Sequence, residues 1–417
     1  MLVYKFGGGT VKDADSIKQL KNISGSCNQK LVIVISALNK VTNQLENLCD
    51  QYFSNSGEYF RTINIIKDYH YNILHDLIPS KNNPVYDDIN SMFSEIEIVL
   101  KSKPTDNYDY TYDQIVSYGE LFSTKIISAY LNLSGINNSW LDARDLIKTD
   151  DTFREAQPNW EICDKLIRSK LNFTNQKIYL TQGFIASDKN NKPTTLGREG
   201  SDFSAALFAY ILNAQKVIIW KDVEGILNAD PADFTSTILL KSLSYHEAIE
   251  MAFYGAKVIH PRTIKPLQNK DIPLLVKAFN KPENPGTIIH SSADRVKIPP
   301  IYIFKKNQVL ISILPRDFSF IVENNISNIF SLLAKYQIKV NLIQNSAISF
   351  SVCVNSDERK IPLFIKEIKN HFKVLYNKDL TLITIRHYTD NTINEQTSGR
   401  KMFIQQKSRK TARFVVS

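Results

Sequence analysis

Long apolar runs and closely spaced cysteines are both missing from this sequence of 417 residues. No stretch of about eighteen apolar residues occurs, so no transmembrane helix is expected. The four cysteines form no Cys-x-x-Cys pair and are scattered, at Cys27, Cys49, Cys163 and Cys353. This argues against a zinc site or a disulfide framework and is typical of the reducing cytoplasm. The chain reaches glycine at position 7, too early for a signal peptide, so we expect a cytoplasmic protein with no membrane partner.

Signals for a protein-held metal and for nucleic acid are also weak. The seven histidines include no group at metal-ligand spacing, and residues 246–250 (HEAIE) lack the second histidine of a zinc helix. The net charge of +9 favours an acidic partner, either nucleic acid or a phosphorylated metabolite. The densest basic stretch, residues 400–413, has the pattern of two short strands around a turn, and no nucleic-acid-binding motif accompanies it. We therefore expect a solvated hairpin there and no nucleic-acid partner.

The first 290 residues have the pattern of an α/β domain. Residues 31–35 (LVIVI) are a continuous β-branched run, typical of a strand buried on both faces. Other strands are predicted at 2–6, 178–180, 216–220 and 273–278, and helices at 13–23, 201–212 and 244–256, with a largely helical stretch over 43–133. This order predicts a mainly parallel sheet covered by helices over residues 1–290.

The pattern changes after a polar, proline-containing stretch at residues 291–308, which is predicted to be a linker. Residues 309–379 then have the order βαββαβ, that of a small α+β module. Residues 380–417 supply three more strands. Between Tyr388 and Lys401 there is too little chain for a full helix, so a truncated second module is expected.

Three consecutive glycines, Gly7, Gly8 and Gly9, stand between the first predicted strand and the first predicted helix. Glycine allows positive φ and close backbone approach, so successive N–H groups can point into one concavity that suits phosphate. Lys5 precedes the turn and would neutralise phosphate oxygens. The loop is not a Walker motif, because no G-x-x-x-x-G-K-[ST] is present, and alone a glycine triplet is more often a tight turn than a phosphate site.

Two more polar clusters flank predicted elements. In the first, residues 197–202 (GREGSD), Arg198 has a planar fork suited to carboxylate or phosphate, Asp202 could hold an ammonium group, and Ser201 is more simply a helix N-cap. In the second, Asp222 and Asp230 follow the buried strand at 216–220. Open α/β sheets bind ligands just past the carboxyl ends of their strands.

Together these clusters resemble the amino-acid kinase superfamily and, within it, the aspartate kinase family. The motifs that carry the resemblance are K-F-G-G at 5–8, V-I-S-A at 34–37, S-Y-G-E at 117–120, T-Q-G-F at 181–184, G-R-E-G-S-D at 197–202 and G-A-K-V-I-H-P at 255–261. The C-terminal modules resemble ACT modules, which pair with one another, so the resemblance also implies a homodimer built through residues 309–417.

The resemblance implies transfer of phosphate from ATP, carried with Mg²⁺, to the side-chain carboxylate of L-aspartate. The product would be 4-phospho-L-aspartate, the first step towards lysine, threonine and methionine. Such a carboxylate has a pKa near ~4 and needs no general base at pH 7. The implied site residues are Lys5 and Asp202 for catalysis; Gly7, Gly8, Gly9 and Ser36 for phosphate; Glu120, Arg198 and Asp202 for aspartate; and Lys221, Asp222, Asp230 and Lys257 for the nucleotide.

Some residues depart from the family pattern. Gly9 stands where the family has Thr or Ala, Lys221 where Thr is frequent, Leu227 where Tyr is frequent, and Ala232 where Arg often follows Asp-Pro. The competing hypotheses are a sibling kinase for glutamate, acetylglutamate, carbamate or UMP, and a catalytically silent sensor.

Overall fold

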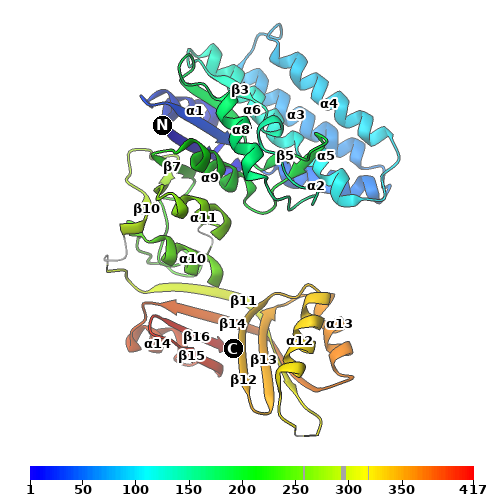
Figure 1. Ribbon diagram of the computed structural model, residues 1–417, viewed down its shortest axis with the longest axis vertical. Coiled ribbons are helices and arrows are strands. Elements are labelled where there is room, and N and C mark those ends of the chain that lie inside the picture. The colour runs from blue at the N-terminus through cyan, green and yellow to red at the C-terminus, as the bar shows by residue number, and fades with distance from the viewer. Residues whose placement is uncertain (257–258, 293–296, 318) are drawn as a thin grey trace. The chain divides into compact units, whose positions relative to one another are not determined.

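The structure is a computed structural model that describes residues 1–256, 259–292, 297–317 and 319–417 (Figure 1). The chain divides into two compact units. The first comprises Met1–Ile226, Leu239–Ile249 and the described part of Ile259–Val296, and the second comprises Leu227–Ile238 and the described parts of Glu250–Val258 and Lys297–Ser417. Within the described ranges, no helix is both long enough and apolar enough to cross a membrane.

An eight-stranded sheet forms the centre of the first unit. Its order is β3-β4-β2-β1-β7-β9-β10-β8, and every pair runs parallel except β10 with β9. The strands are β1 (Leu2–Phe6), β2 (Leu31–Ile35), β3 (Ser139–Leu141), β4 (Ile178–Gln182), β7 (Lys216–Lys221), β8 (Ser242–Leu243), β9 (Leu274–Ala278) and β10 (Thr287–Ile289). The predicted mainly parallel α/β sheet is confirmed, and the short strands β3, β8 and β10 were not predicted.

Helices cover this sheet, and Figure 1 shows α2 to α6 grouped together. The helices of this unit are α1 (Ala14–Gly25), α2 (Val41–Phe53), α3 (Tyr59–Leu77), α4 (Val85–Lys101), α5 (Tyr108–Val116), α6 (Tyr118–Leu133), α7 (Ala143–Leu146), α8 (Trp160–Lys170), α9 (Gly200–Leu212), α10 (Tyr245–Tyr254) and α11 (Pro261–Asn269). The last residues of α10 belong to the second unit. A hairpin is formed by β5 (Ile185–Ser187) and β6 (Pro193–Thr195). Tyr4 and Phe6 of β1 pack with α1 to α6 in one core cluster, whereas α9 contacts β1, β2 and β7.

The second unit is an antiparallel sheet of six strands with three helices among its described residues. The strand order is β12-β13-β11-β14-β16-β15. The elements are β11 (Ile301–Leu314), α12 (Glu323–Lys335), β12 (Val340–Ser346), β13 (Ser349–Asn355), α13 (Lys360–Ile368), β14 (Lys373–Arg386), α14 (Asp390–Thr397), β15 (Met402–Lys407) and β16 (Thr411–Val416). The predicted βαββαβ order and the basic hairpin, now β15 and β16, are confirmed.

Two expectations about this unit are wrong. Residues 301–308 of the expected linker belong to β11, because this strand pairs with β14 from Ile301 onwards. The pairing register shifts at Lys305/Gln308, and Asn307 has a positive φ of 55°, so an irregular stretch of polar residues hides the strand in the sequence. The second module also contains a short helix, α14, whose Thr389 side chain caps the first turn.

Candidate active site

Lys5 and Asp202 form a buried ion pair at the carboxyl end of the central strands. Lys5 is the fourth of the five residues of β1, and it points away from the core that holds its neighbours Tyr4 and Phe6. Its Nζ lies 2.6 Å from Oδ1 of Asp202, in the first turn of α9. The two side chains are 11% and 5% exposed, so this charge pair is shielded from water.

The charge on Asp202 is held by its neighbours. Burial alone would disfavour the carboxylate, but the charges of Lys5 and Lys221 and the hydrogen bond from Lys5 outweigh it. The pKa of Asp202 is therefore below its usual range. Lys221 is the last residue of β7, next to β1 in the sheet, so its predicted place near the site agrees with this electrostatic effect.

The glycine loop packs against the loop that follows β2. A Cβ built on Gly8 would lie 2.5 Å from the carbonyl oxygen of Asn39 and 2.9 Å from that of Ala37. The Asn39 N–H donates to the Gly8 oxygen at 3.0 Å, and the Ser36 N–H donates to the Phe6 oxygen at 3.1 Å. Only glycine fits at position 8, and the packing brings Ser36 next to the loop.

The other two glycines lie beside charged groups. A Cβ on Gly7 would be 3.3 Å from Lys5 Nζ, and a Cβ on Gly9 would be 3.9 Å from Oδ2 of Asp222. The ammonium of Lys5 and the carboxylate of Asp222 therefore flank a backbone turn without side chains. Backbone N–H groups at such a turn, beside a cation, suit the binding of a phosphate group.

Glu120 is a buried carboxyl with one open oxygen. It lies in the first turn of α6, and its Oε1 accepts the Ala37 N–H at 3.2 Å. Among the described residues, its Oε2 has no hydrogen-bond partner. Burial raises the pKa of Glu120 to about 8, against the opposing effect of the Ala37 hydrogen bond. A buried acid with a free oxygen is well suited to receive a cationic ligand.

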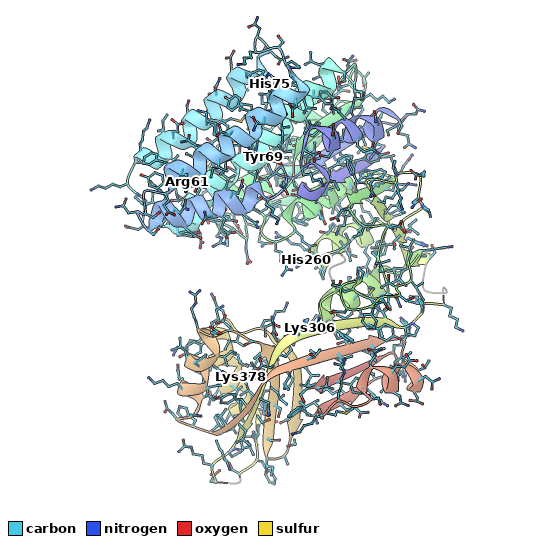
Figure 2. The ribbon with its side chains drawn as sticks, turned by 180° about the vertical axis from the view of Figure 1, so that it is seen from behind. Arg61, Tyr69, His75, His260, Lys306 and Lys378 are labelled. Atoms are coloured by element: carbon cyan, nitrogen blue, oxygen red, sulfur yellow. The ribbon has the colours of Figure 1, made fainter. Side chains whose placement is uncertain are left out.

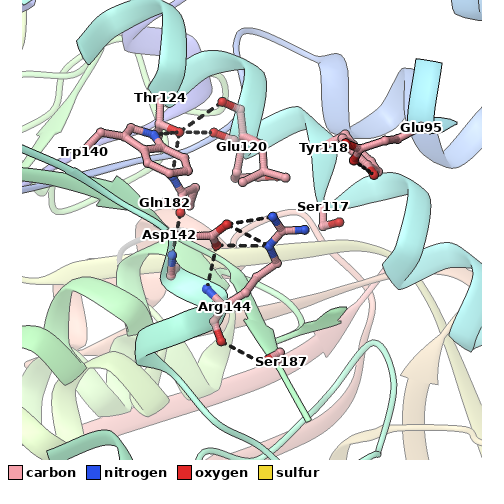
Figure 3. Close-up of polar contacts among 12 residues, drawn as sticks. Glu95, Ser117, Tyr118, Glu120, Thr124, Trp140, Asp142, Arg144, Gln182 and Ser187 are labelled. Atoms are coloured by element: carbon pink, nitrogen blue, oxygen red, sulfur yellow. Dashed lines mark hydrogen bonds and ion pairs between the residues drawn. The ribbon is translucent and has the colours of Figure 1, made fainter. Parts of the chain in front are cut away.

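A hydrogen-bond network that the sequence did not reveal supports Glu120 (Figure 3). Thr124 Oγ1 donates to the Glu120 carbonyl oxygen at 2.7 Å, and it accepts from Gln182 Nε2 at 2.7 Å and from Trp140 Nε1 at 3.1 Å. Gln182 Oε1 in turn accepts the Ala143 N–H at 2.7 Å. The glutamine of the T-Q-G-F motif therefore fixes α6 relative to β4, and its membership of that motif was its sequence signal.

The remaining predicted residues are less constrained. Arg198 is exposed in the turn before α9 and makes no hydrogen bond or ion pair with the described residues. Asp230 belongs to the second unit, where its Oδ1 accepts the Ala232 N–H at 2.9 Å. Lys257 lies outside the described residues. The first unit thus brings together the glycine loop, Lys5, Ser36, Glu120, Asp202, Lys221 and Asp222.

Comparison with known proteins assigns the chain to a family. The model of the amino acid kinase family matches residues 1–278. The chain belongs to the amino acid kinase family. This membership accounts for the parallel sheet and for the position of the glycine loop at the end of β1.

Members of the amino acid kinase family that resemble the chain include aspartokinases. Lysine-sensitive aspartokinase 3 of Escherichia coli (strain K12) is 31% identical over 364 residues, which are 85% of this chain and 78% of that protein. The chloroplastic bifunctional aspartokinase/homoserine dehydrogenase 2 of Zea mays is 29% identical over 89% of this chain. The chain spans only 41% of the length of that protein. It spans 42% of the length of the chloroplastic bifunctional aspartokinase/homoserine dehydrogenase 1 of Arabidopsis thaliana.

Solved structures of this family agree with the fold over the full chain. Aspartokinase III of E. coli, in complex with aspartate and ADP, superposes with a TM-score of 0.84 at 26% identity, covering 100% of this chain and 96% of that one. The aspartate kinase of Clostridium acetobutylicum has a TM-score of 0.81 at 22% identity with the same coverage, a likeness of fold. The amino-acid kinase fold with a C-terminal ACT-like region is therefore established for this chain.

Proposed function

We propose that the protein is an aspartate kinase, which transfers the γ-phosphate of ATP to the side-chain carboxylate of L-aspartate and forms 4-phospho-L-aspartate. The observation that carries the proposal is the buried Lys5–Asp202 pair beside the glycine loop, with the open carboxyl of Glu120 close to the same loop system. The relatives named aspartokinases, one of them solved with aspartate and ADP, support this substrate pair. In this proposal the reaction is the first step towards lysine, threonine and methionine.

The nucleophile determines what the protein must supply. The side-chain carboxylate of aspartate is ionised at neutral pH, since its pKa is near ~4, so no residue has to remove a proton. Catalysis then consists of positioning and of neutralising charge on the transferred phosphoryl group. In this proposal Lys5 and the amides of the glycine loop do this, and the Ser36 hydroxyl adds a hydrogen bond.

The substrate amino acid has two further charged groups. Arg198 would bind its α-carboxylate through the guanidinium fork, and Glu120 and Asp202 would face its α-ammonium. Glu120 matches a cation better than an acetylated amine, because its buried Oε2 has no partner among the described residues and its carboxylate form needs a counter-charge that an uncharged group cannot supply. This favours aspartate over N-acetylglutamate.

ATP would carry its own Mg²⁺. The described residues contain no group of three or more His, Cys, Asp or Glu side chains that could hold a metal. Mg²⁺ on a nucleotide needs only one or two carboxylates in addition to phosphate and water oxygens, and Asp222 beside Gly9 fits that requirement. In the proposal Asp222 holds the ion, which neutralises phosphate charge, and Lys221 binds the nucleotide; Asp230 and Lys257 stay predicted nucleotide contacts.

Substrate identity can be tested with hydroxylamine, which traps an acyl phosphate as a hydroxamate. With ATP and Mg²⁺, L-aspartate is expected to give an aspartyl hydroxamate that is detected by its ferric complex. N-acetyl-L-glutamate, glutamate and carbamate serve as matched controls and are expected to give none. Equal turnover of N-acetyl-L-glutamate would assign the chain to a sibling kinase, and no turnover of any substrate would favour a silent sensor.

Aspartate binding is expected to release most of one proton at pH 7. Glu120 is mainly protonated in the free protein at this pH, because burial raises its pKa to about 8, and the ammonium of bound aspartate would lower that pKa. The kcat/KM for aspartate should consequently rise with pH up to about 8. Calorimetry in buffers of different ionisation enthalpy measures the released proton.

The Glu120→Gln variant is the control for this experiment. It keeps the shape of the side chain, and its amide oxygen can still accept the Ala37 N–H. It is expected to bind aspartate more weakly and without proton release. Proton release of the same size in the variant would show that another group titrates.

The C-terminal region is proposed to regulate the kinase and to form a homodimer. We assign residues 1–290 to catalysis, and residues 309–379 and 380–417 to two ACT-like modules. β12 is the outer strand at one end of the six-stranded sheet, and Ile343 and the neighbouring Ile348 are exposed there, at 41% and 46%. Exposed apolar side chains that lie next to each other are a surface against which a second copy of the chain could pack.

A further inference from the structure

Glu199 occupies a backbone conformation that glycine adopts far more readily. The Gly200 N–H donates to the Gly197 oxygen at 2.9 Å, which closes a turn with Arg198 and Glu199 at its centre. Glu199 has φ 55° and ψ 27°, in the left-handed region. A Cβ makes this region unfavourable, so the residue must be held there by its surroundings. Strain of this kind at a binding site points to a functional constraint.

The side chain of Glu199 is tied to the start of α11. Its Oε2 accepts the backbone N–H of His260 at 2.9 Å. His260, labelled in Figure 2, is the N-cap of α11, and its Nδ1 accepts the Arg262 N–H at 3.2 Å. Glycine at position 199 would relieve the strain but could not make this contact. The glutamate therefore has an unfavourable backbone conformation, and its side chain makes a hydrogen bond that glycine could not make.

Arg262 provides a second tether on the other side of Arg198. Its Nη1 donates to the Leu196 oxygen at 2.5 Å, its Nη2 donates to the Ala156 oxygen at 3.0 Å, and its guanidinium lies 4.2 Å from the centre of the Phe203 ring. The start of α11 thus holds the chain both before and after Arg198. The side chain of Arg198 itself has no partner among the described residues, so these tethers set its direction.

The backbone of Glu199 also reaches the ion pair of the site. Its carbonyl oxygen accepts the Asp202 N–H at 3.1 Å and the Phe203 N–H at 3.2 Å. A rotation of the residue at position 199 would move the first turn of α9, and with it the carboxylate that pairs with Lys5. The tether therefore affects the two groups that are assigned to the amino-acid substrate.

We propose that Glu199 is a positioning residue, whose carboxylate holds the Gly197–Gly200 turn through the His260 N–H so that Arg198 meets the α-carboxylate of aspartate. The inference rests on the proposed aspartate kinase activity. It differs from a direct role, in which the charge of the exposed Glu199 would contact the substrate ammonium. The two roles differ in whether they need the negative charge of the Glu199 side chain. A neutral amide oxygen can also accept a backbone N–H, whereas an ammonium group prefers a carboxylate.

Two substitutions at position 199 separate these roles. Glu199→Gly removes the tether and relieves the strain, and it is expected to raise KM for L-aspartate about tenfold, while KM for ATP changes less than about twofold. Glu199→Gln keeps an oxygen for the His260 N–H and is expected to retain a KM for L-aspartate within about twofold of the unmodified protein. The matched control is Asn213→Gly at the other end of α9, where Asn213 also has a positive φ of 50°; it should change neither KM.

Hydrogen exchange of the His260 amide gives a readout that does not depend on catalysis. The exchange should be faster in Glu199→Gly and near normal in Glu199→Gln. An unchanged KM for L-aspartate in Glu199→Gly, or a Glu199→Gln variant as impaired as Glu199→Gly, would overturn the positioning role. Absence of aspartate phosphorylation by the unmodified protein would instead overturn the proposed function, and the exchange rates would still show whether the tether exists.

Discussion

Replacing Lys5 with methionine is expected to lower kcat about a hundredfold to a thousandfold. The ammonium of Lys5 lies beside the glycine loop in a buried position, where a fixed charge stabilises a developing negative charge far more than it would in water. Because that charge develops mainly in the transition state, KM for ATP should change much less than kcat. Steady-state kinetics with a coupled ADP assay measures both.

Two controls support the interpretation of the Lys5→Met kinetics. Lys216→Met changes the same residue type at the amino end of the neighbouring strand β7, where Lys216 pairs with Leu2, and it should leave the kinetics unchanged. Lys5→Arg keeps the charge in a different shape and should recover part of kcat. A loss confined to KM for ATP would show that Lys5 only anchors the nucleotide in the ground state.

The fold of the first unit was predictable because its central strands are mostly apolar and one of them, β2, is a continuous β-branched run. The residues of β1, β2 and β4 are buried throughout, so no polar face obscures them, and glycine or polar clusters mark where they end. The short strands β8 and β10 have two and three residues, too few to form a recognisable pattern. In the second unit, the polar residues around the kink at Asn307 made part of a paired strand resemble a linker.

Site residues that belong to a sequence motif could be predicted. Contacts between residues on different helices and strands could not. Lys5 and Asp202 are about two hundred positions apart, yet both belong to motifs, and the structure pairs them. Gln182 belongs to a motif too, but its partners Thr124 and Ala143 lie on other elements and have no local signature. Glu199 also lies within a motif, but its tether to His260 has no local signature, because it requires α11 to lie against α9.

Asp202→Asn is expected to destabilise the first unit by about 3–5 kcal/mol at pH 7, because it leaves the ammonium of Lys5 buried without a counter-charge. Lys5→Met should cost a similar amount, since it leaves a buried carboxylate. The double variant Lys5→Met/Asp202→Asn removes both charges and should be more stable than either single variant. A double-mutant cycle would then give a coupling energy of several kcal/mol.

Urea unfolding followed by tryptophan fluorescence reports on the first unit alone, because all three tryptophans, Trp140, Trp160 and Trp220, belong to it. The pH dependence is a further test. In the unmodified protein the pKa of Asp202 is lowered, so its contribution to stability is present above the unfolded pKa of about 4 and is lost only as the pH falls through the lower folded pKa. In Lys5→Met the buried carboxyl should instead have a raised pKa and take up a proton as the pH falls.

The difference in unfolding free energy between the unmodified protein and Lys5→Met should therefore grow as the pH is raised from about 5 to about 8. In the Asp202→Asn background, the effect of Lys5→Met should lose this pH dependence, because the titrating carboxyl is gone. Asp202→Asn should also lower kcat strongly, since Lys5 then has no partner to hold its direction beside the glycine loop. Additive effects of the two substitutions on stability, at every pH, would show that Lys5 and Asp202 do not act as a pair.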